Sequence, residues 1–459
     1  MLLGGVALAA AVRAVFVAIQ VTPVHDPWRQ LALIQNLRRG SGFTLFDGQP
    51  YTWYTPLWHQ ICAMLPSRID PSWMAALLST LAVPAFYAWL RRVEGDAGAF
   101  TAQAGMILLA TFGPVVAFTC HYAQEALALF LTMAGLLSVA LSVRPSVALG
   151  GGILLGLSVV VRLNFVFNLL LALASLRGRR QGTALAVGIA LPISAAWWRN
   201  HRIIESFPYV FTWDGLATRS ADFGLLSTLV IPMHPAVGEA LRRLHHIIVP
   251  RPEWAHGEIL LFLICGAACV LASRRWYLFL PGAFGLIYFG FFDRTLSSNF
   301  FRIYLGLFPV LLAAIAVMAG RLRAFDHRWA PIAAWGLIAL TVATGARYLV
   351  PPEMVPLEMV TPPPELLTEK AYMVNSGFYQ PDAMAYRFPE KSFIGMPLDP
   401  AQFEDFRRWF PQYRHILWHD FSVQDELARY LQQSGKVTVV ARGKNEYGRL
   451  YEVLQLKGE

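Results

Sequence analysis

Long apolar segments recur along the first 350 residues of this chain and constrain its fold more than any other feature. Most are long enough to cross the roughly 30 Å hydrocarbon core of a bilayer as a helix. Because 56% of the 459 residues are hydrophobic and only 15% are charged, a soluble fold could not bury this much apolar surface. We therefore expect an all-α polytopic membrane protein with about eleven transmembrane helices. The predicted spans are Leu2–Ile19, Trp73–Leu90, Gly98–Phe118, Tyr122–Leu141, Val147–Val161, Leu163–Leu176, Thr183–Trp198, Ile259–Leu271, Trp276–Phe292, Phe300–Ala319 and Ala330–Val350.

Basic residues in the short loops predict how these spans are oriented. Every loop that follows the second, fourth, sixth, eighth or tenth span is basic, as expected for cytoplasmic loops when the amino terminus lies inside. The two long loops, 22–72 and 199–257, and the carboxyl-terminal region then lie outside. The charge reports topology, and no basic patch interleaved with aromatic residues indicates a nucleic-acid partner. The basic loop residues are Arg91 and Arg92, Arg144, Arg177, Arg179 and Arg180, Arg274 and Arg275, and Arg321, Arg323 and Arg328.

Arg13 interrupts the first predicted span. A charge at that depth is costly unless it snorkels toward the interface from near a helix end or faces the protein interior. The sequence leaves both interpretations open.

The carboxyl-terminal quarter differs in character. Residues 1–350 are expected to form the transmembrane domain, and a proline-rich linker from Pro351 leads into a small α/β domain within 351–459 on the outer face. Helices are predicted at Phe403–Trp409 and Val423–Gln432, and strands at His415–Trp418, Val437–Ala441 and Leu450–Leu456. In the second outer loop, Ala236–Val249 has the pattern of a helix in the membrane interface.

The first outer loop has structure of its own. Asp26 opens it at a membrane edge and is followed by a predicted short helix, a Gly40-Ser41-Gly42 break, an aromatic run that includes Tyr54, and a second helix after Pro56. Structured loops of this length are usually functional, so we interpret it as the catalytic loop of a membrane enzyme. Taken alone, Asp26 followed by Pro27 is also a favourable helix N-cap.

Charged side chains at the outer ends of several spans are the other candidates. Glu125 opens the fourth span, where an acid also complements the helix dipole. Guanidinium groups at the outer edge of different spans suggest an anionic ligand, most simply a phosphate. His25 beside Asp26 could assist a divalent cation such as Mg²⁺ or Mn²⁺, although one His with one Asp is weak evidence for a metal site. No Walker loop, dinucleotide fingerprint, zincin motif or nucleophile elbow is present in the sequence. The outer-edge arginines are Arg162, Arg199, Arg202 and Arg302.

These features together resemble the GT-C superfamily of membrane glycosyltransferases, in particular its protein O-mannosyltransferase and aminoarabinose transferase branch. The likeness is carried by Asp26 after the first span, the two-helix outer loop and Glu125 at the start of the fourth span. Three short motifs add to it: Arg162-Leu163-Asn164, Trp198-Arg199-Asn200 and Phe301-Arg302-Ile303-Tyr304. The acid that mannosyltransferases of this kind often carry beside the first one is missing, because His25 precedes Asp26.

The resemblance implies transfer of a sugar, with inversion, from a polyprenyl-phosphate donor to a hydroxyl acceptor on the outer face. Asp26 would be the general base, and Glu125 would orient the acceptor or assist a cation. Arg162, Arg199 and Arg302 would hold the phosphate. His121, Tyr122 and Tyr54 are further expected substrate-binding residues. We expect an integral protein of a bacterial inner membrane with a periplasmic active site.

Several alternatives stay open at this point. The acceptor could be a glycan, a lipid or a protein. A transporter or flippase of a lipid-linked glycan would need charged residues near mid-membrane and an internal repeat, and no repeat is evident in the sequence. A non-catalytic relative acting as an assembly subunit is the third hypothesis.

Overall fold

The computed structural model describes residues 2–19, 26–45, 49–51, 55–95, 98–120, 124–211, 217–219, 257–290, 305–350, 357–375, 380–397, 400–419, 427, 430–431 and 433–457. The chain divides into two compact units. The first contains residues 1–20, 70–197 and 229–352, and the second contains residues 21–69, 198–228 and 353–459. The predicted interfacial helix at Ala236–Val249 lies outside the described residues.

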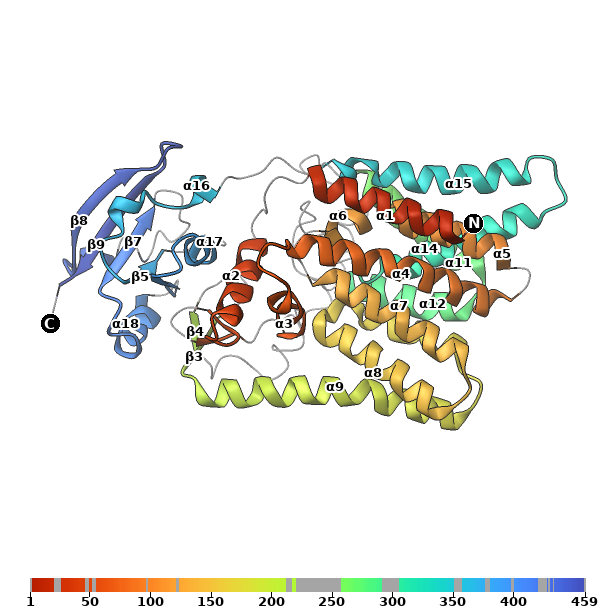
Figure 1. Ribbon diagram of the computed structural model, residues 1–459, viewed down its shortest axis with the longest axis horizontal. Coiled ribbons are helices and arrows are strands. Elements are labelled where there is room, and N and C mark those ends of the chain that lie inside the picture. Colours follow the sequence, from red (N-terminus) through yellow and green to blue (C-terminus); the bar gives the residue numbers. More distant parts are fainter. Residues whose placement is uncertain are drawn as a thin grey trace. The chain divides into compact units, whose positions relative to one another are not determined.

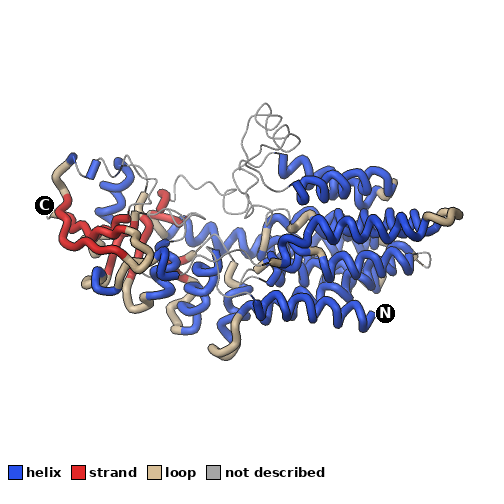
Figure 2. The backbone as a smooth tube through the Cα atoms, turned by 90° about the horizontal axis from the view of Figure 1, so that it is seen from above, coloured by secondary structure: helices blue, strands red, loops and turns tan. Residues whose placement is uncertain are grey.

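The first unit is a bundle of apolar helices (Figures 1 and 2). A helix occupies the position of each predicted span within the described residues, although Leu163–Ser175 is a 3₁₀ helix and the third span is broken. The helices are α1 (Leu2–Ile19), α4 (Pro71–Glu94), α5 (Ala99–Thr111), α6 (Gly113–Cys120), α7 (Glu125–Leu141), α8 (Pro145–Val161), η2 (Leu163–Ser175), α9 (Arg179–Ser206), α11 (Gly257–Ser273), α12 (Trp276–Gly290), α14 (Phe308–Ala324), α15 (Ala330–Gly345) and η5 (Ala346–Leu349).

Fewer of these helices than predicted are long enough to cross a membrane alone. Among the described residues, 3 helices have the required length and hydropathy, or 4 if the bent pair α5 and α6 forms one span. Several others, including α7 and α8, are equally apolar but shorter. The predicted count of about eleven spans is therefore not confirmed, although helices lie at the predicted positions.

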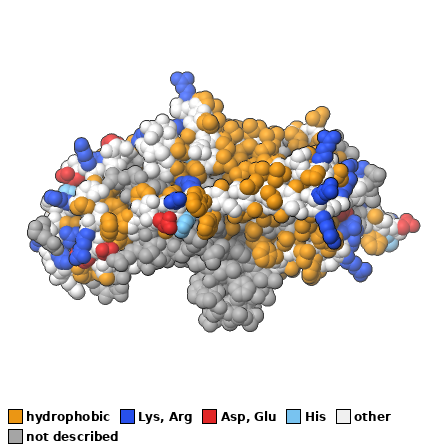
Figure 3. Space-filling view, turned by 90° about the horizontal axis from the view of Figure 1, so that it is seen from below, with side chains coloured by type: hydrophobic (Ala, Val, Ile, Leu, Met, Phe, Trp, Pro, Cys, Tyr) orange, Lys and Arg blue, Asp and Glu red, His pale blue; other side chains and the backbone are white. Residues whose placement is uncertain are grey.

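Hydrophobic side chains also cover much of the outside of the bundle. Figure 3 shows a broad apolar area, with Lys and Arg side chains gathered at one end of it. Val15, Leu191, Ile264 and Trp335 are each about half exposed. Contiguous apolar surface of this kind is stable against lipid rather than water. The chain is an integral membrane protein.

The break between α5 and α6 decides the role of Arg13. The two helices meet at 52°, and Pro114 at the start of α6 has no N–H to donate to the carbonyl of Ala110. Arg13 is fully buried, and its guanidinium donates to that carbonyl at 3.0 Å and to the Leu109 carbonyl at 3.1 Å. Its Nε donates to Ser79 Oγ at 2.8 Å. Arg13 thus faces the protein interior, where it satisfies backbone carbonyls next to the helix break, and the snorkelling interpretation is wrong.

The second unit contains residues 21–69 and 198–228, which correspond to the two loops predicted to lie outside and are called the outer loops below. Helix α2 (Asp26–Arg38) and helix α3 (Leu57–Met64) confirm the two predicted loop helices. Between them, Gly40 and Gly42 have positive φ values of 77° and 80°, which side chains rarely adopt, and they form the predicted break. Two short hairpins were not predicted: β1 (Thr44–Leu45) pairs with β2 (Gln49–Pro50), and β3 (Tyr209–Phe211) pairs with β4 (Ala217–Arg219).

A five-stranded sheet forms the carboxyl-terminal part of the second unit, in the order β6-β5-β7-β9-β8. Strands β7 (His415–His419), β8 (Val437–Lys444) and β9 (Leu450–Leu456) lie at the predicted positions, as does helix α18 (Pro400–Trp409). Strands β5 (Ala371–Val374) and β6 (Ser392–Gly395) and helix α17 (Gln380–Arg387) were missed. Strands β6 and β7 both pair with β5 in parallel, one on each edge of β5. The shorter helical elements here are α16 (Leu357–Val360) and η6 (Pro364–Leu366).

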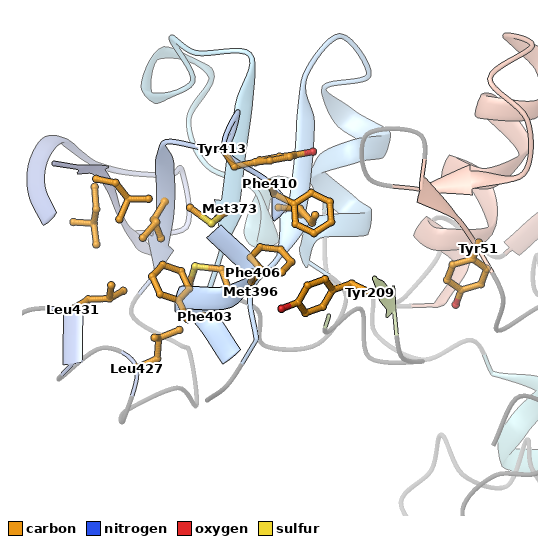
Figure 4. Packing of buried hydrophobic residues seen from close by; sticks show 14 of the residues in the cluster. Tyr51, Tyr209, Met373, Met396, Phe403, Phe406, Phe410, Tyr413, Leu427 and Leu431 are labelled. Carbon is orange, nitrogen blue, oxygen red and sulfur yellow. The ribbon is translucent and has the colours of Figure 1, made fainter. Parts of the chain in front are cut away.

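The sheet and the outer loops share one hydrophobic core. Figure 4 shows Phe403 and Phe406 of α18, and Phe410 just after it, packed near Met373 and Met396 of the sheet region. The same cluster includes Leu33 of α2, together with Tyr51 and Tyr209 from the outer loops. On α2, the ring of Trp28 packs against Tyr386 of α17 in a tilted arrangement, with ring centroids 5.0 Å apart. The catalytic loop predicted from the sequence is therefore packed directly against the α/β domain.

Candidate functional site

In the helical bundle, the structure joins two of the predicted site residues in a buried ion pair. Glu125 is the first residue of α7, and Arg162 follows the last residue of α8. The backbone of Arg162 is extended, with φ −151° and ψ 107°, so the helix ends there and η2 begins on the other side. Arg162 Nη2 lies 2.9 Å from Glu125 Oε1, with the two side chains 19% and 0% exposed. Sequence position alone did not predict this contact.

Buried amide side chains accompany this ion pair. Gln124, Asn164 and Asn168 are all buried in the same unit. Asn168 Nδ2 donates to the carbonyl of Gly306 at 2.7 Å, and a Cβ at Gly306 would overlap the carbonyl oxygen of Asn164, so only glycine permits this approach. Among the described residues, none donates a hydrogen bond to Gln124 Oε1. Polar and ionisable groups inside an apolar bundle are functional candidates because burying them is costly.

In the outer loops, cationic side chains gather around Tyr51. Arg29 of α2 is fully buried, and its Nη1 donates to Tyr51 Oη at 3.2 Å. Arg199 Nη2 donates to the Tyr51 carbonyl at 3.2 Å, and its Nη1 donates to Asn200 Oδ1 at 2.9 Å. The guanidinium of Arg199 also lies 5.6 Å from the centre of the Phe43 ring. Arg199 thus contacts the loop that carries Tyr51 and Phe43, whereas the guanidinium of Arg202 lies 4.7 Å from the centre of the Trp198 ring.

Two further polar side chains of this loop are fully buried. His59 of α3 packs against the Phe43 ring, and burial lowers the pKa of its imidazole to about 3, so it is neutral at pH 7. Gln30 of α2 is likewise 0% exposed. Neither was predicted, although Gln30 lies only four positions after Asp26, which the sequence singled out.

The remaining predicted residues are placed only in part. Asp26 is the first residue of α2, and its side chain lies outside the described part of the structure. The predicted residues His25, Tyr54, His121, Tyr122 and Arg302 also lie outside the described residues. Among the residues that are described, no group of three or more His, Cys, Asp or Glu side chains could hold a metal ion.

The fold defined by these elements is GT-C-like. Solved structures with this fold resemble the chain over most of its length at low sequence identity. No family model and no curated protein matches the sequence.

Three similar structures illustrate the likeness. ArnT from Cupriavidus metallidurans in the apo state superposes with a TM-score of 0.55 at 11% identity, covering 98% of this chain and 97% of that chain. The archaeal oligosaccharyltransferase AglB from Archaeoglobus fulgidus, in complex with an inhibitory peptide and a dolichol-phosphate, gives 0.52 at 13% identity, covering 98% and 74%. The oligosaccharyltransferase from the same organism, in complex with Zn and sulfate, gives 0.51 at 15% identity, covering 94% and 69%.

Proposed function

We propose that this chain is an inverting glycosyltransferase that moves a sugar from a polyprenyl-phosphate donor to a hydroxyl acceptor at the outer face of the membrane. The observation that carries the proposal is the buried Glu125–Arg162 ion pair at helix ends of a GT-C-like bundle. The similar structures include an oligosaccharyltransferase in complex with dolichol-phosphate and a peptide, which supports a lipid-phosphate donor and a glycan or protein acceptor.

The proposed chemistry needs one base and several cations. Asp26, at the start of α2, takes the proton of the acceptor hydroxyl as that oxygen attacks the sugar carbon. The bond between this carbon and the phosphate oxygen breaks, and the charge that develops on the phosphate is stabilised by Arg162, Arg199 and Arg302. Glu125 holds the Arg162 guanidinium in place through their 2.9 Å contact. Each step uses side chains of this chain and none is assigned to a metal ion.

The environment of Arg13 favours a transferase over a transporter. A transport pathway would use charged groups at mid-membrane depth. The guanidinium of Arg13 instead donates to Ser79 and to the carbonyls of Ala9, Leu109 and Ala110. Its charge therefore has a structural role at the α5–α6 break.

The test is sugar transfer from radiolabelled polyprenyl-phosphate donors in purified membranes, comparing wild type with Asp26→Asn. We expect the variant to lose about 10²–10⁴-fold in rate, which is the usual contribution of a general base. Asp70→Asn is a matched control, because Asp70 caps α4 by accepting from the Ser72 N–H at 2.8 Å and asparagine caps equally well.

Each other outcome has a distinct meaning. Equal rates for Asp26→Asn and wild type at equal expression would show that Asp26 is only a helix cap. No transfer from any donor, together with vectorial movement of a labelled glycolipid in vesicles, would contradict the transferase and support a transporter.

A further inference from the structure

Gln30 is a buried side chain that the fold does not explain. It lies on α2 with 0% of its surface exposed, and neither its Nε2 nor its Oε1 has a hydrogen-bond partner among the described residues. Burying an amide without hydrogen bonds costs free energy, and most buried polar atoms in native proteins are paired. An apolar residue of similar size would fill the same space at lower cost. A side chain that destabilises the fold in this way is expected to have a role in binding.

The neighbours of Gln30 on α2 are engaged in other contacts. Trp28 packs against Tyr386, and Arg29 donates to Tyr51 Oη at 3.2 Å. Leu33 belongs to the hydrophobic core shared with the sheet. The residues on either side of Gln30 therefore make the contacts that hold this helix in place, and the Gln30 amide makes none of these contacts.

The position of Gln30 relates it to the proposed base. Residues four apart in an α-helix lie on the same face, one turn from each other. Position 30 is one turn after position 26 on the continuous helix Asp26–Arg38. Gln30 therefore lies on the same face of α2 as position 26, where the proposed base stands.

The chemistry of an amide indicates which part of the donor it binds. An amide carries no charge at any pH and offers both donor and acceptor atoms, which suits a hydroxyl group. Phosphate is better bound by guanidinium groups, which the chain supplies separately. We propose that Gln30 binds a hydroxyl of the donor's sugar, and this proposal rests on the proposed glycosyltransferase function.

The experiment measures ligand-dependent thermal stability of the purified full-length protein in detergent. The midpoint of unfolding is compared with bare polyprenyl phosphate, polyprenyl-phosphate mannose and polyprenyl-phosphate aminoarabinose, for wild type and Gln30→Leu. Gln60→Leu is the matched control, since Gln60 is an exposed glutamine on helix α3 of the same loop.

We expect three results. Without ligand, Gln30→Leu melts at or above the wild-type midpoint, because the substitution removes a buried amide that has no partner. In wild type and Gln60→Leu, a glycosylated carrier raises the midpoint more than the bare carrier does, and in Gln30→Leu this sugar-dependent difference disappears. In transfer assays, Gln30→Leu raises KM for the donor about tenfold with little change in kcat, as for a contact made equally in the ground and transition states.

Three outcomes would overturn the proposal. A lower ligand-free midpoint for Gln30→Leu than for Gln60→Leu would show that Gln30 has a packing role. A sugar-dependent difference that Gln30→Leu retains, or that wild type lacks with both sugars, would show that Gln30 does not bind the sugar. Because the unfolding midpoints need no turnover, they are separate from the test of the proposed function, which fails when wild type transfers no sugar.

Discussion

Replacing Arg162 by methionine tests the energetic asymmetry of the Glu125–Arg162 pair. Glu125 is 0% exposed, whereas Arg162 retains 19% exposure and can still be partly hydrated. Removing the guanidinium takes the cation away from a buried carboxylate, which costs about 3–5 kcal/mol. Replacing Glu125 by glutamine keeps an acceptor for Arg162 and loses only the charged part of the hydrogen bond, about 1–2 kcal/mol.

The two substitutions are also expected to be coupled. In the double variant Glu125→Gln with Arg162→Met, no buried charge remains to be compensated. Its loss of stability should therefore be smaller than the sum of the two single losses by about 2 kcal/mol. The assay is reversible unfolding in mixed micelles, followed by tryptophan fluorescence, for wild type, both single variants and the double variant.

The reasoning would be refuted by symmetric or additive losses. If Glu125→Gln and Arg162→Met destabilise equally, the difference in burial has no energetic meaning. If the double variant loses the full sum, the 2.9 Å contact does not couple the two residues. An Arg68→Met control, at an exposed arginine outside the bundle, should change stability by less than about 0.5 kcal/mol.

Two further predictions concern buried groups elsewhere in the chain. Arg13→Lys should destabilise the bundle by about 2 kcal/mol or more, because one ammonium group cannot reach both Ser79 on α4 and the α5 carbonyls. Thermal unfolding, with Arg68→Lys as the control, would measure this loss. A lysine variant as stable as wild type would contradict the prediction. The pKa of His59 and that of His419 are lowered by burial from 6.5 to about 3. Below pH 6.5 the unfolded chain therefore binds more protons than the folded chain. The free energy of unfolding should be highest above this pH. As the pH drops toward 3, each histidine should lower it by about 1.4 kcal/mol per pH unit. Unfolding of wild type and His59→Asn between pH 7 and pH 4 checks the sign and the slope, and an unchanged slope in the variant would exclude His59 as a cause.

Local sequence patterns determined most of the secondary structure. Apolar segments predicted the positions of the bundle helices, and short runs rich in branched and aromatic residues predicted strands β7 and β9, because these patterns depend only on neighbours along the chain. The Gly40 and Gly42 break was also readable, since positive φ favours glycine. Strands β5 and β6 were missed because each is only 4 residues long, too short for a sequence pattern to be recognised. Each forms a strand through its hydrogen bonds to parallel neighbours from distant parts of the chain.

The sequence also singled out Glu125, Arg162 and Arg199 as residue types that could bind a charged ligand, but it could not say what each one contacts. Arg162 pairs with Glu125, which lies 37 positions earlier in the sequence (162 minus 125). Arg199 donates to the carbonyl of Tyr51. From the sequence, Arg13 could equally have snorkelled toward the interface. The structure shows instead that the helix break at Pro114 leaves a backbone carbonyl to which Arg13 donates. The burial of Gln30 likewise depends on chain segments that pack against α2. A side chain's identity limits what it can bond, but only the packing of distant segments determines which partner it meets and how much water remains around it.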